Sequence, residues 1–255
     1  MSLEKIAVVI PARMASTRFP GKVMKDIHGE PLIWRVYEGC MGSEFVKSED
    51  VFVLTPDEEV GKAVRERGGR VVITGPARTV LERCSQVASL NAFQNYDLIV
   101  VVQGDEPMVK PEMIDLAIAK IGLHTISCLV KELDENDDSH NPNMVKLVMD
   151  HMNRILYFSR AVIPGVTPER HAGIKRAPFY KQVCVMAFTR NALVDYNTMA
   201  LGRLERAEGI DQLRYLESGW TIKGIVSEYE TQAVDTQEDL DKVRELWNED
   251  RSAGV

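Results

Sequence analysis

Apolar, β-branched runs alternate with segments of helical periodicity along the first half of the chain, and this alternation constrains the fold most. The expected strands are residues 6–10, 51–55, 70–73, 97–102 and 125–130, and the expected helices are residues 31–41, 57–67, 78–90 and 111–121. Strands that are apolar throughout are typical of a parallel sheet covered by helices on both faces. The sequence therefore predicts an α/β fold with a mostly parallel central sheet.

The alternation changes between residues 131 and 190. An acidic stretch at 131–138 precedes short apolar runs at 145–149 and 155–158, which indicate antiparallel strands, and residues 180–188 indicate a longer strand that returns to the core. Further expected elements are helices at 190–196 and 203–217, a strand at 221–226 and a last helix from Thr236 to about residue 248. We expect one domain, residues 1–255, with a β-rich insert at 131–190 that covers the site or forms a dimer contact.

Composition excludes several classes of protein. The net charge of −7 disfavours nonspecific binding of nucleic acid, which requires a basic face. Four widely spaced cysteines indicate buried thiols rather than a zinc site or a disulfide framework. Because the sequence shows neither a long apolar run nor a charged-then-apolar leader, we expect no membrane span and no secretory signal, and we predict a cytoplasmic protein.

The first expected strand runs directly into a loop that is rich in cations. Arg13, Arg18 and Lys22 fall within ten residues, and Ser16 and Thr17 add hydroxyl groups between them. Ligands of open α/β sheets bind beyond the carboxyl ends of the strands, and guanidinium and ammonium groups suit phosphate oxygens. Surface cations beside a turn are the alternative. The position directly after the first strand favours a polyphosphate-binding loop.

Two acidic residues are candidates for a metal site at the same edge of the sheet. Asp105 follows an apolar strand, with Gly104 expected to leave room for a ligand. Mg²⁺ commonly binds one or two carboxylates together with substrate phosphates, although Asp105 also suits a helix N-cap. Asp235 precedes the last expected helix. Spacing alone leaves open whether it is a second metal ligand or part of the start of a helix, where Thr236 and Asp239 have the form of a capping box.

A cationic loop and carboxylates at one sheet edge indicate nucleotidyl transfer. In that reaction a metal and the cations neutralise the triphosphate and the pyrophosphate leaving group while a sugar hydroxyl attacks the α-phosphate. The chain has neither the Gly-x-x-x-x-Gly-Lys-Ser/Thr motif of NTPases nor a Gly-x-Gly-x-x-Gly motif after the first strand. Ordinary P-loop chemistry and dinucleotide redox chemistry are therefore disfavoured.

With these motifs, the sequence resembles the CMP-sugar synthetases, and most closely those that act on 3-deoxy-manno-octulosonate (Kdo). The matching motifs follow one another along nearly the whole chain, at residues 10–22, 102–107, 141–146, 157–164, 204–214 and 234–240. The resemblance implies a Rossmann-like nucleotidyltransferase fold with a β-rich dimerisation insert, a homodimer and Mg²⁺. It also implies transfer of CMP from CTP to a 2-keto-3-deoxy sugar acid, with release of pyrophosphate.

The resemblance further assigns roles to individual residues. It implies that Arg13, Lys22 and Asp105 are catalytic and that Asp105 and Asp235 hold the metal. The nucleotide-binding residues that it implies are Ala12, Arg13, Ser16, Thr17, Arg18, Lys22, Arg83 and Gln103. The sugar-binding residues that it implies are Arg160, for the sugar carboxylate, and Gln182, Met186, Asp211 and Gln212.

The sequence departs from the family near the base and the acceptor. Residues 79–83, Thr-Val-Leu-Glu-Arg, stand where the family has His-x-Ser-Gly-Thr-Glu-Arg; Gln182 and Met186 replace a His and a Tyr that face the sugar, and Asp211 replaces a Glu. A Met cannot donate the hydrogen bond of a Tyr, and a buried partner left unpaired costs about 1–3 kcal/mol. The resemblance implies Kdo or a related ulosonic acid as the acceptor, whereas these departures are also compatible with a modified Kdo, another ulosonic acid or a different sugar. Two alternatives stay open: a nucleotidyltransferase for a different sugar or sugar phosphate, and a noncatalytic nucleotide-binding regulator.

Overall fold

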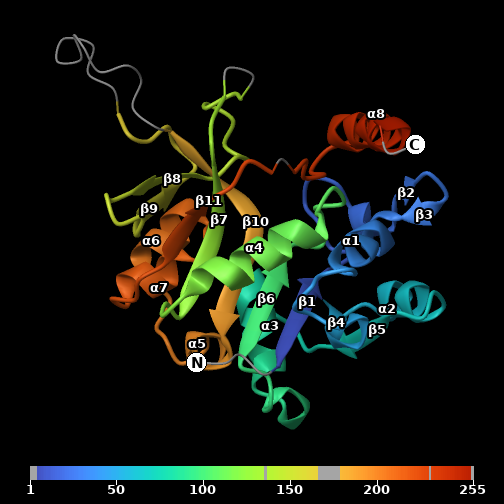
Figure 1. The fold of residues 1–255 in the computed structure, drawn as a ribbon, viewed down its shortest axis with the longest axis horizontal. Helices are drawn as coiled ribbons and strands as arrows, with labels where there is room; N and C mark the ends of the chain where they lie inside the picture. Colours follow the sequence, from blue (N-terminus) through green and yellow to red (C-terminus); the bar gives the residue numbers. More distant parts are fainter. Residues whose placement is uncertain (1–4, 135–136, 166–178, 230, 254–255) are drawn as a thin grey trace.

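A computed structural model describes residues 5–134, 137–165, 179–229 and 231–253. Its central sheet has the strand order β11-β7-β10-β6-β1-β4-β5 (Figure 1). Every neighbouring pair along this order is parallel except the two pairs that involve β10, which runs antiparallel to both β6 and β7. These strands are β1 (Ile6–Pro11), β4 (Val51–Thr55), β5 (Arg70–Ile73), β6 (Leu98–Val102), β7 (Ile126–Glu132), β10 (Tyr180–Thr189) and β11 (Lys223–Val226). The predicted α/β fold with a mostly parallel sheet is confirmed.

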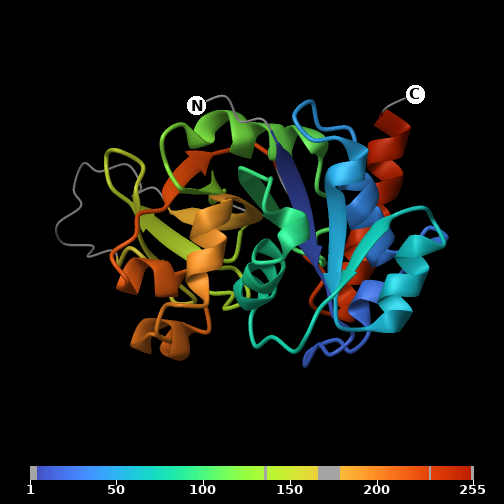
Figure 2. The same ribbon diagram turned by 90° about the horizontal axis from the view of Figure 1, so that it is seen from below.

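Helices cover both faces of the sheet (Figure 2). One face packs against α1 (Leu32–Cys40), α2 (Glu58–Arg65), α4 (Pro111–Ile121) and α8 (Gln237–Ala253). The other packs against α3 (Val80–Ala88), α5 (Arg190–Tyr196) and α7 (Leu213–Glu217). Alternate residues of one strand enter opposite cores: Val8 and Ile10 of β1 join the first, and Ala7 and Val9 join the second. Burial on both faces is why these strands lack the polar alternation of a half-exposed sheet.

The segment expected as a β-rich insert contributes an antiparallel hairpin, as predicted. It consists of β8 (Lys146–Met149) and β9 (Ile155–Ser159), and β8 also pairs with β10. The strand predicted at 180–188 is β10, which lies between β6 and β7 in the centre of the sheet. Part of the insert, residues 135–136 and 166–178, lies outside the described residues.

The single helix expected at 203–217 is wrong, because two short helices occupy this range. α6 (Arg203–Glu208) ends at Gly209, whose φ of 63° is left-handed, and α7 begins at Leu213. A left-handed glycine redirects the chain and terminates a helix without the steric cost that a Cβ would bring. The turn between the helices carries Asp211 and Gln212, two of the residues assigned to the sugar site.

Short elements complete the fold. The cation-rich loop ends in a single 3₁₀ turn, η1 (Lys22–Met24), and a small hairpin of β2 (Asp26–Ile27) and β3 (Glu30–Pro31) follows. Two more 3₁₀ turns are η2 (Ser48–Asp50) and η3 (Asn91–Phe93). In the part of the chain that the structure describes, no helix combines the length and the apolar character needed to cross a membrane.

Candidate nucleotide and metal site

A cleft of about 240 Å³ lies at the carboxyl ends of β1 and β6. Every residue assigned to nucleotide binding lines it, and so does Asp105: these residues are Ala12, Arg13, Ser16, Thr17, Arg18, Lys22, Arg83, Gln103 and Asp105. Pro11, Val23, Ala77, Thr79, Val80 and Gly104 complete its lining. The topology therefore brings the cationic loop and the strand-end carboxylate to one cavity, as the sequence predicts.

Gly104 allows the ends of these two strands to approach each other. Its N–H donates to the carbonyl of Pro11 at 3.3 Å, and a Cβ at this position would lie only 2.6 Å from that carbonyl oxygen. Any larger residue would push β6 away from β1 and displace Asp105. Gly104 thus allows β6 to lie close to β1, and it also lines the cleft.

Two hydrogen bonds fix the cationic loop, one to Asp57 outside the loop and one between its two ends. The N–H of Met14 donates to the carboxylate of Asp57 at 2.7 Å, and the N–H of Gly21 donates to the carbonyl of Met14 at 3.0 Å. Gly21 has a φ of 69°, a left-handed conformation that glycine adopts without strain. The result is that Lys22 returns beneath the cleft at the start of η1.

Lys22 joins the two acids predicted to hold a metal. Its Nζ donates to Asp105 Oδ2 at 2.6 Å and to Asp235 Oδ1 at 2.8 Å, and Lys22 is only 8% exposed. Arg18 also reaches Asp235, at 3.0 Å between Nη2 and Oδ1. Burial lowers the pKa of Lys22, but the two neighbouring carboxylates outweigh it and raise that pKa above the ordinary value. The expected convergence of Asp105 and Asp235 is confirmed.

Backbone and capping hydrogen bonds fix the segment that carries Asp235, and they leave its carboxylate able to contact Lys22. The N–H of Val234 donates to the carbonyl of Asp105 at 2.9 Å. Thr236 and Asp239 form the predicted capping box: the N–H of Thr236 donates to the Asp239 carboxylate at 2.9 Å, and the N–H of Asp239 donates to the Thr236 hydroxyl at 3.2 Å. The capping box is therefore confirmed, and it is compatible with a metal-binding role for Asp235, because the cap uses Thr236 and Asp239 and leaves the Asp235 side chain facing Lys22.

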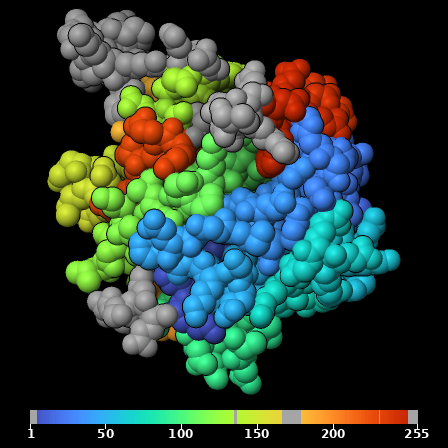
Figure 3. Space-filling model, turned by 45° about the vertical axis from the view of Figure 1, so that its right-hand side comes forward, coloured from blue at the N-terminus to red at the C-terminus, as the bar shows by residue number. Residues whose placement is uncertain are grey.

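Helix α8 is held against the β2–β3 hairpin, which follows Lys22 in the sequence. Arg244 donates to the carbonyl of Asp26 at 2.7 Å, and the ring of His28 lies 2.8 Å from the carbonyl of Arg244. Figure 3 shows this contact as the red helix seated beside the blue amino-terminal segment. Lys22 and Asp235 are thus brought together by elements from opposite ends of the sequence.

The acid pair fits a hard divalent cation. Asp105 Oδ1 is buried and makes no hydrogen bond within the described part of the chain, although buried carboxylate oxygens usually have a partner. In the same part of the chain no three His, Cys, Asp or Glu side chains gather into a metal cluster. Two carboxylates with one open oxygen match Mg²⁺, which uses few protein ligands and keeps other positions for phosphates or water.

Arg83 supplies a buried cation on the opposite wall. It is 4% exposed, and its Nη1 donates to the hydroxyl of Thr74 and to the carbonyl of Gly75, both neutral groups. Burial lowers the pKa of Arg83, and the nearby charge of Arg13 lowers it further. Within the described residues no ion pair with a carboxylate is formed by Arg83, so its charge is available to an anion in the cleft.

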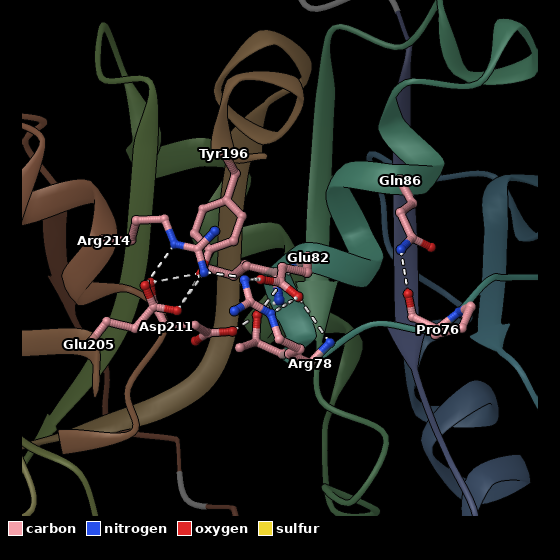
Figure 4. A network of polar contacts seen from close by, with 10 residues as sticks. Pro76, Arg78, Glu82, Gln86, Tyr196, Glu205, Asp211 and Arg214 are labelled. Carbon is pink, nitrogen blue, oxygen red and sulfur yellow. Dashed lines mark hydrogen bonds and ion pairs between the residues drawn. The ribbon is translucent and has the colours of Figure 1, made fainter. Parts of the chain in front are cut away.

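A closed polar network behind this wall holds the start of α3 (Figure 4). Arg214, which is 2% exposed, donates to Glu205 at 2.6 Å and to Glu82 of α3 at 3.1 Å. Asp211 accepts from the N–H of Leu81 at 2.9 Å, and burial raises the pKa of Asp211. Asp211, assigned by resemblance to the sugar site, thus caps the helix that presents Arg83.

The other residues assigned to the sugar do not line the cleft. Met186 is 4% exposed, and its sulfur accepts from the side-chain amides of Gln182 at 3.6 Å and of Gln212 at 3.5 Å. Arg160 donates to the carbonyls of Glu208, Pro142 and Gly209 at 2.8, 2.8 and 3.4 Å. The structure therefore gathers the residues assigned to the nucleotide and Asp105 around the cleft, and the residues assigned to the sugar are not part of its lining.

Two residues that were given no role turn out to connect these regions. Asn143 accepts a hydrogen bond from Arg18 through its side-chain oxygen. Lys146 is fully buried, and its ammonium group donates to the carbonyls of Asn141, Met144 and Arg160 at 2.8, 2.8 and 2.7 Å. Both lie in the matching motif at 141–146, which was the available signal. They fix the turn that links the insert to the cationic loop.

Comparison with known proteins agrees with this geometry. A family described as cytidylyltransferase matches residues 7–225. A 3-deoxy-manno-octulosonate cytidylyltransferase of Geobacter metallireducens is 40% identical over 255 residues, covering 94% of this chain and 97% of the relative. An 8-amino-3,8-dideoxy-manno-octulosonate cytidylyltransferase of Shewanella pealeana is 35% identical over 241 residues, covering 92% and 95%.

Among solved structures, a CMP:2-keto-3-deoxy-manno-octonic acid synthetase complexed with CTP superposes with a TM-score of 0.85 at 30% identity. The match covers 97% of this chain and 100% of that one. Sequence and fold therefore agree over almost the whole length. The chain belongs to the cytidylyltransferase family.

Proposed function

We propose that this chain transfers CMP from CTP to 3-deoxy-manno-octulosonate or a closely related 2-keto-3-deoxy sugar acid, with release of pyrophosphate. The observation that carries the proposal is the meeting of Asp105 and Asp235 around Lys22, at a cleft walled by Arg13, Arg18 and Arg83. The names of the relatives support the nucleotide and the acceptor class.

The chain's own residues supply binding and charge neutralisation. Asp105 and Asp235 would hold Mg²⁺, which when bound polarises the phosphate and neutralises charge on the leaving group. Arg13, Lys22 and Arg83 bind the triphosphate and stabilise the pyrophosphate as it departs. The sugar hydroxyl loses its proton to solvent as its oxygen forms a bond to the α-phosphorus, while the bond from that phosphorus to the bridging oxygen of the β-phosphate breaks and pyrophosphate leaves. The protein thus contributes positioning and electrostatics rather than covalent chemistry.

The acceptor is proposed to bind near Arg160 and the Met186 sulfur. Arg160 uses three N–H groups on backbone carbonyls. A guanidinium has five, so two can still bind a sugar carboxylate. The relative named for the 8-amino sugar gives a second candidate acceptor within the same class, and a direct comparison of the two sugars tests it.

We also propose a cytoplasmic homodimer that contacts through the insert and activates its sugar for surface-glycan synthesis. Met152 and Leu156 of the β8–β9 hairpin are 57% and 58% exposed. Apolar side chains left open in this way support an interface on the insert. Light scattering of the purified chain checks the mass, and Leu156→Glu is expected to shift a dimer to monomer.

The central experiment is an activity assay with defined partners. Protein, Mg²⁺ and CTP are incubated with Kdo, its 8-amino analogue, other ulosonic acids, sugar phosphates or no acceptor, and pyrophosphate and the CMP-sugar are quantified. We expect pyrophosphate and a CMP-sugar in equal amounts with a ulosonic acid. Arg160→Ala is expected to raise KM for the sugar far more than for CTP. CTP binding without turnover on any acceptor would instead support a noncatalytic regulator, whereas turnover of sugar phosphates alone would support a different nucleotidyltransferase.

A further inference from the structure

Lys22 lies where a metal bridging the two acids would lie. Its Nζ contacts Asp105 Oδ2 at 2.6 Å and Asp235 Oδ1 at 2.8 Å, and these acids come from positions 83 and 213 residues away along the sequence. Two carboxylates this close repel each other unless a cation stands between them. One ammonium group therefore makes the interaction with both carboxylates that a divalent cation would make.

We propose that Lys22 is a built-in placeholder cation that keeps the metal out until a nucleoside triphosphate draws the Lys22 ammonium group away. This inference rests on the proposed function and adds an order to it: metal and nucleotide enter together, and the acid pair has low affinity for a divalent cation alone. Lys22 thus has a role in the empty site that is distinct from binding phosphates.

The balance of charge leads to this order. Lys22 and Arg18 bring two positive charges to the two negative charges of the acids, so the cluster is already neutral. A divalent cation that entered alone would compete for the same oxygens and lie beside two like charges. A triphosphate brings several negative charges to the cleft, where they attract the ammonium group and release the carboxylates.

Lys22 is better suited to this role than Arg18. Lysine carries a compact charge on a flexible four-carbon stem, so its ammonium can move while the backbone stays fixed in η1. The Lys22 side chain is 10% exposed and contacts both acids, whereas the Arg18 side chain is 48% exposed and contacts Asp235 alone among them. Arg18 is also bound by Asn143. Removal of Lys22 should therefore change metal affinity more than removal of Arg18.

The placeholder leaves one ligand position unfilled. Asp105 Oδ1 is buried without a hydrogen-bond partner in the described residues, although Oδ2 of the same carboxylate is bound to Lys22. The ammonium group thus holds the two acids together but satisfies Asp105 only in part. A metal that replaced it would find an open oxygen as well as the pair that Lys22 now contacts.

The test measures Mn²⁺ binding without nucleotide, by electron paramagnetic resonance of the free ion. We expect Lys22→Met to bind Mn²⁺ about tenfold or more tightly than wild type, because a competing charge is lost while both carboxylates stay. Arg18→Met should give a smaller gain. Lys25→Met is the matched control, since Lys25 lies over the Phe19 ring, and it should bind Mn²⁺ like wild type. Adding Asp105→Asn to Lys22→Met should abolish the gain.

The proposal is overturned if folded Lys22→Met binds Mn²⁺ no more tightly than wild type, or if the gain survives Asp105→Asn. Lys22→Gln provides a second variant if the methionine variant fails to fold, and circular dichroism checks both. Because no turnover is measured, this result is separate from the proposed function. Absence of pyrophosphate release with every acceptor would refute the reaction and leave the Mn²⁺ comparison intact.

Discussion

The Lys22 cluster and the Arg214 cluster have the same plan and different surroundings. In each, one buried cation joins two carboxylates from distant parts of the chain: Lys22 joins Asp105 and Asp235, and Arg214 joins Glu205 and Glu82. In the Arg214 cluster both carboxylates have further donors, since Tyr196 donates to Glu205 and Arg78 donates to Glu82. In the Lys22 cluster one oxygen of Asp105 has no partner in the described residues, and a cleft lies beside it.

This difference separates a structural ion pair from a binding site. A fully hydrogen-bonded cluster gains nothing from a ligand, and the planar fork of Arg214 fixes Glu205 through two donors, at 2.7 and 2.6 Å. A cluster with an open oxygen and a flexible lysine can exchange its cation for another. Removing a member of the first should therefore affect stability, and removing a member of the second should affect turnover.

The largest expected effect is on stability, from Arg214→Met. After this change, only the Tyr196 hydroxyl among the described side chains donates to the buried Glu205 carboxylate. Removal of one partner of a buried pair costs about 3–5 kcal/mol. Urea unfolding measures the loss. Arg206→Met, at an exposed position of the same helix as Glu205, is the control and should change little.

A second change tests the cause of that loss. Glu205→Gln in the Arg214→Met background removes the unpaired charge and should restore most of the stability. If the double variant is as unstable as the single one, the loss comes from packing of the Arg214 side chain over the Tyr196 ring, whose centroid is 4.1 Å from the guanidinium carbon.

Asp105→Asn should reduce turnover and leave stability nearly unchanged, which is the opposite of the effect expected of Arg214→Met. We expect the rate of pyrophosphate release to fall by about 10²–10³-fold, because a carboxylate proposed to hold the metal loses its charge. The free energy of unfolding should change little, since Lys22 keeps Asp235 as its partner. Asp241→Asn, on the exposed side of α8, is the control. A large loss of stability with unchanged turnover would place this cluster with the structural one.

The pH dependence of stability tests Asp211, which accepts a hydrogen bond from the start of α3 beside the Arg214 cluster. Burial raises the pKa of Asp211 above its ordinary value of 3.8. Between pH 3.8 and the raised pKa, the folded state therefore retains a proton that the unfolded state has lost. The stabilisation that this gives is complete below pH 3.8 and declines as pH rises through the raised pKa. Asp211→Asn keeps an oxygen for the Leu81 N–H and cannot ionise. Its stability relative to wild type, from urea unfolding at several pH values, should improve as pH rises; a constant difference would contradict the shift.

Sequence patterns alone located the cationic loop and Asp105 because both follow strand ends, whereas Arg83 of α3 was assigned through the resemblance. Unbroken apolar strands define the sheet, and the ends of parallel strands meet at one edge. Arg13 and Asp105 follow such ends closely, and Lys22 lies at the end of the loop that follows β1. Asp235 needed the resemblance, because a residue before a helix has no strand to place it. The geometry then showed that the capping box uses Thr236 and Asp239, whereas the Asp235 carboxylate contacts Lys22 and Arg18.

The acceptor side depends on contacts that spacing does not reveal. β10 runs antiparallel through the centre of the sheet, so the surroundings of Gln182 and Met186 come from segments far apart in sequence. Gly209 splits one apparent helix into two, which turns Asp211 toward α3. Lys146 was given no role from the sequence, yet it is fully buried and its ammonium group donates to three backbone carbonyls. Local periodicity contains no information on such long-range pairing.

The smallest expected effect comes from Thr236→Ala. This change tests whether the capping box only stabilises α8 or also positions Asp235 of the acid pair. Loss of a Thr cap should lower the free energy of unfolding by about 1 kcal/mol, as seen in urea unfolding. Turnover should fall far less than in Asp105→Asn, because the bond from the Val234 N–H to the Asp105 carbonyl still holds the segment beside the cleft. Thr236→Ser keeps the hydroxyl and should restore stability. If Thr236→Ala instead reduces turnover as strongly as Asp105→Asn, the cap positions Asp235, and the acid pair depends on the start of α8.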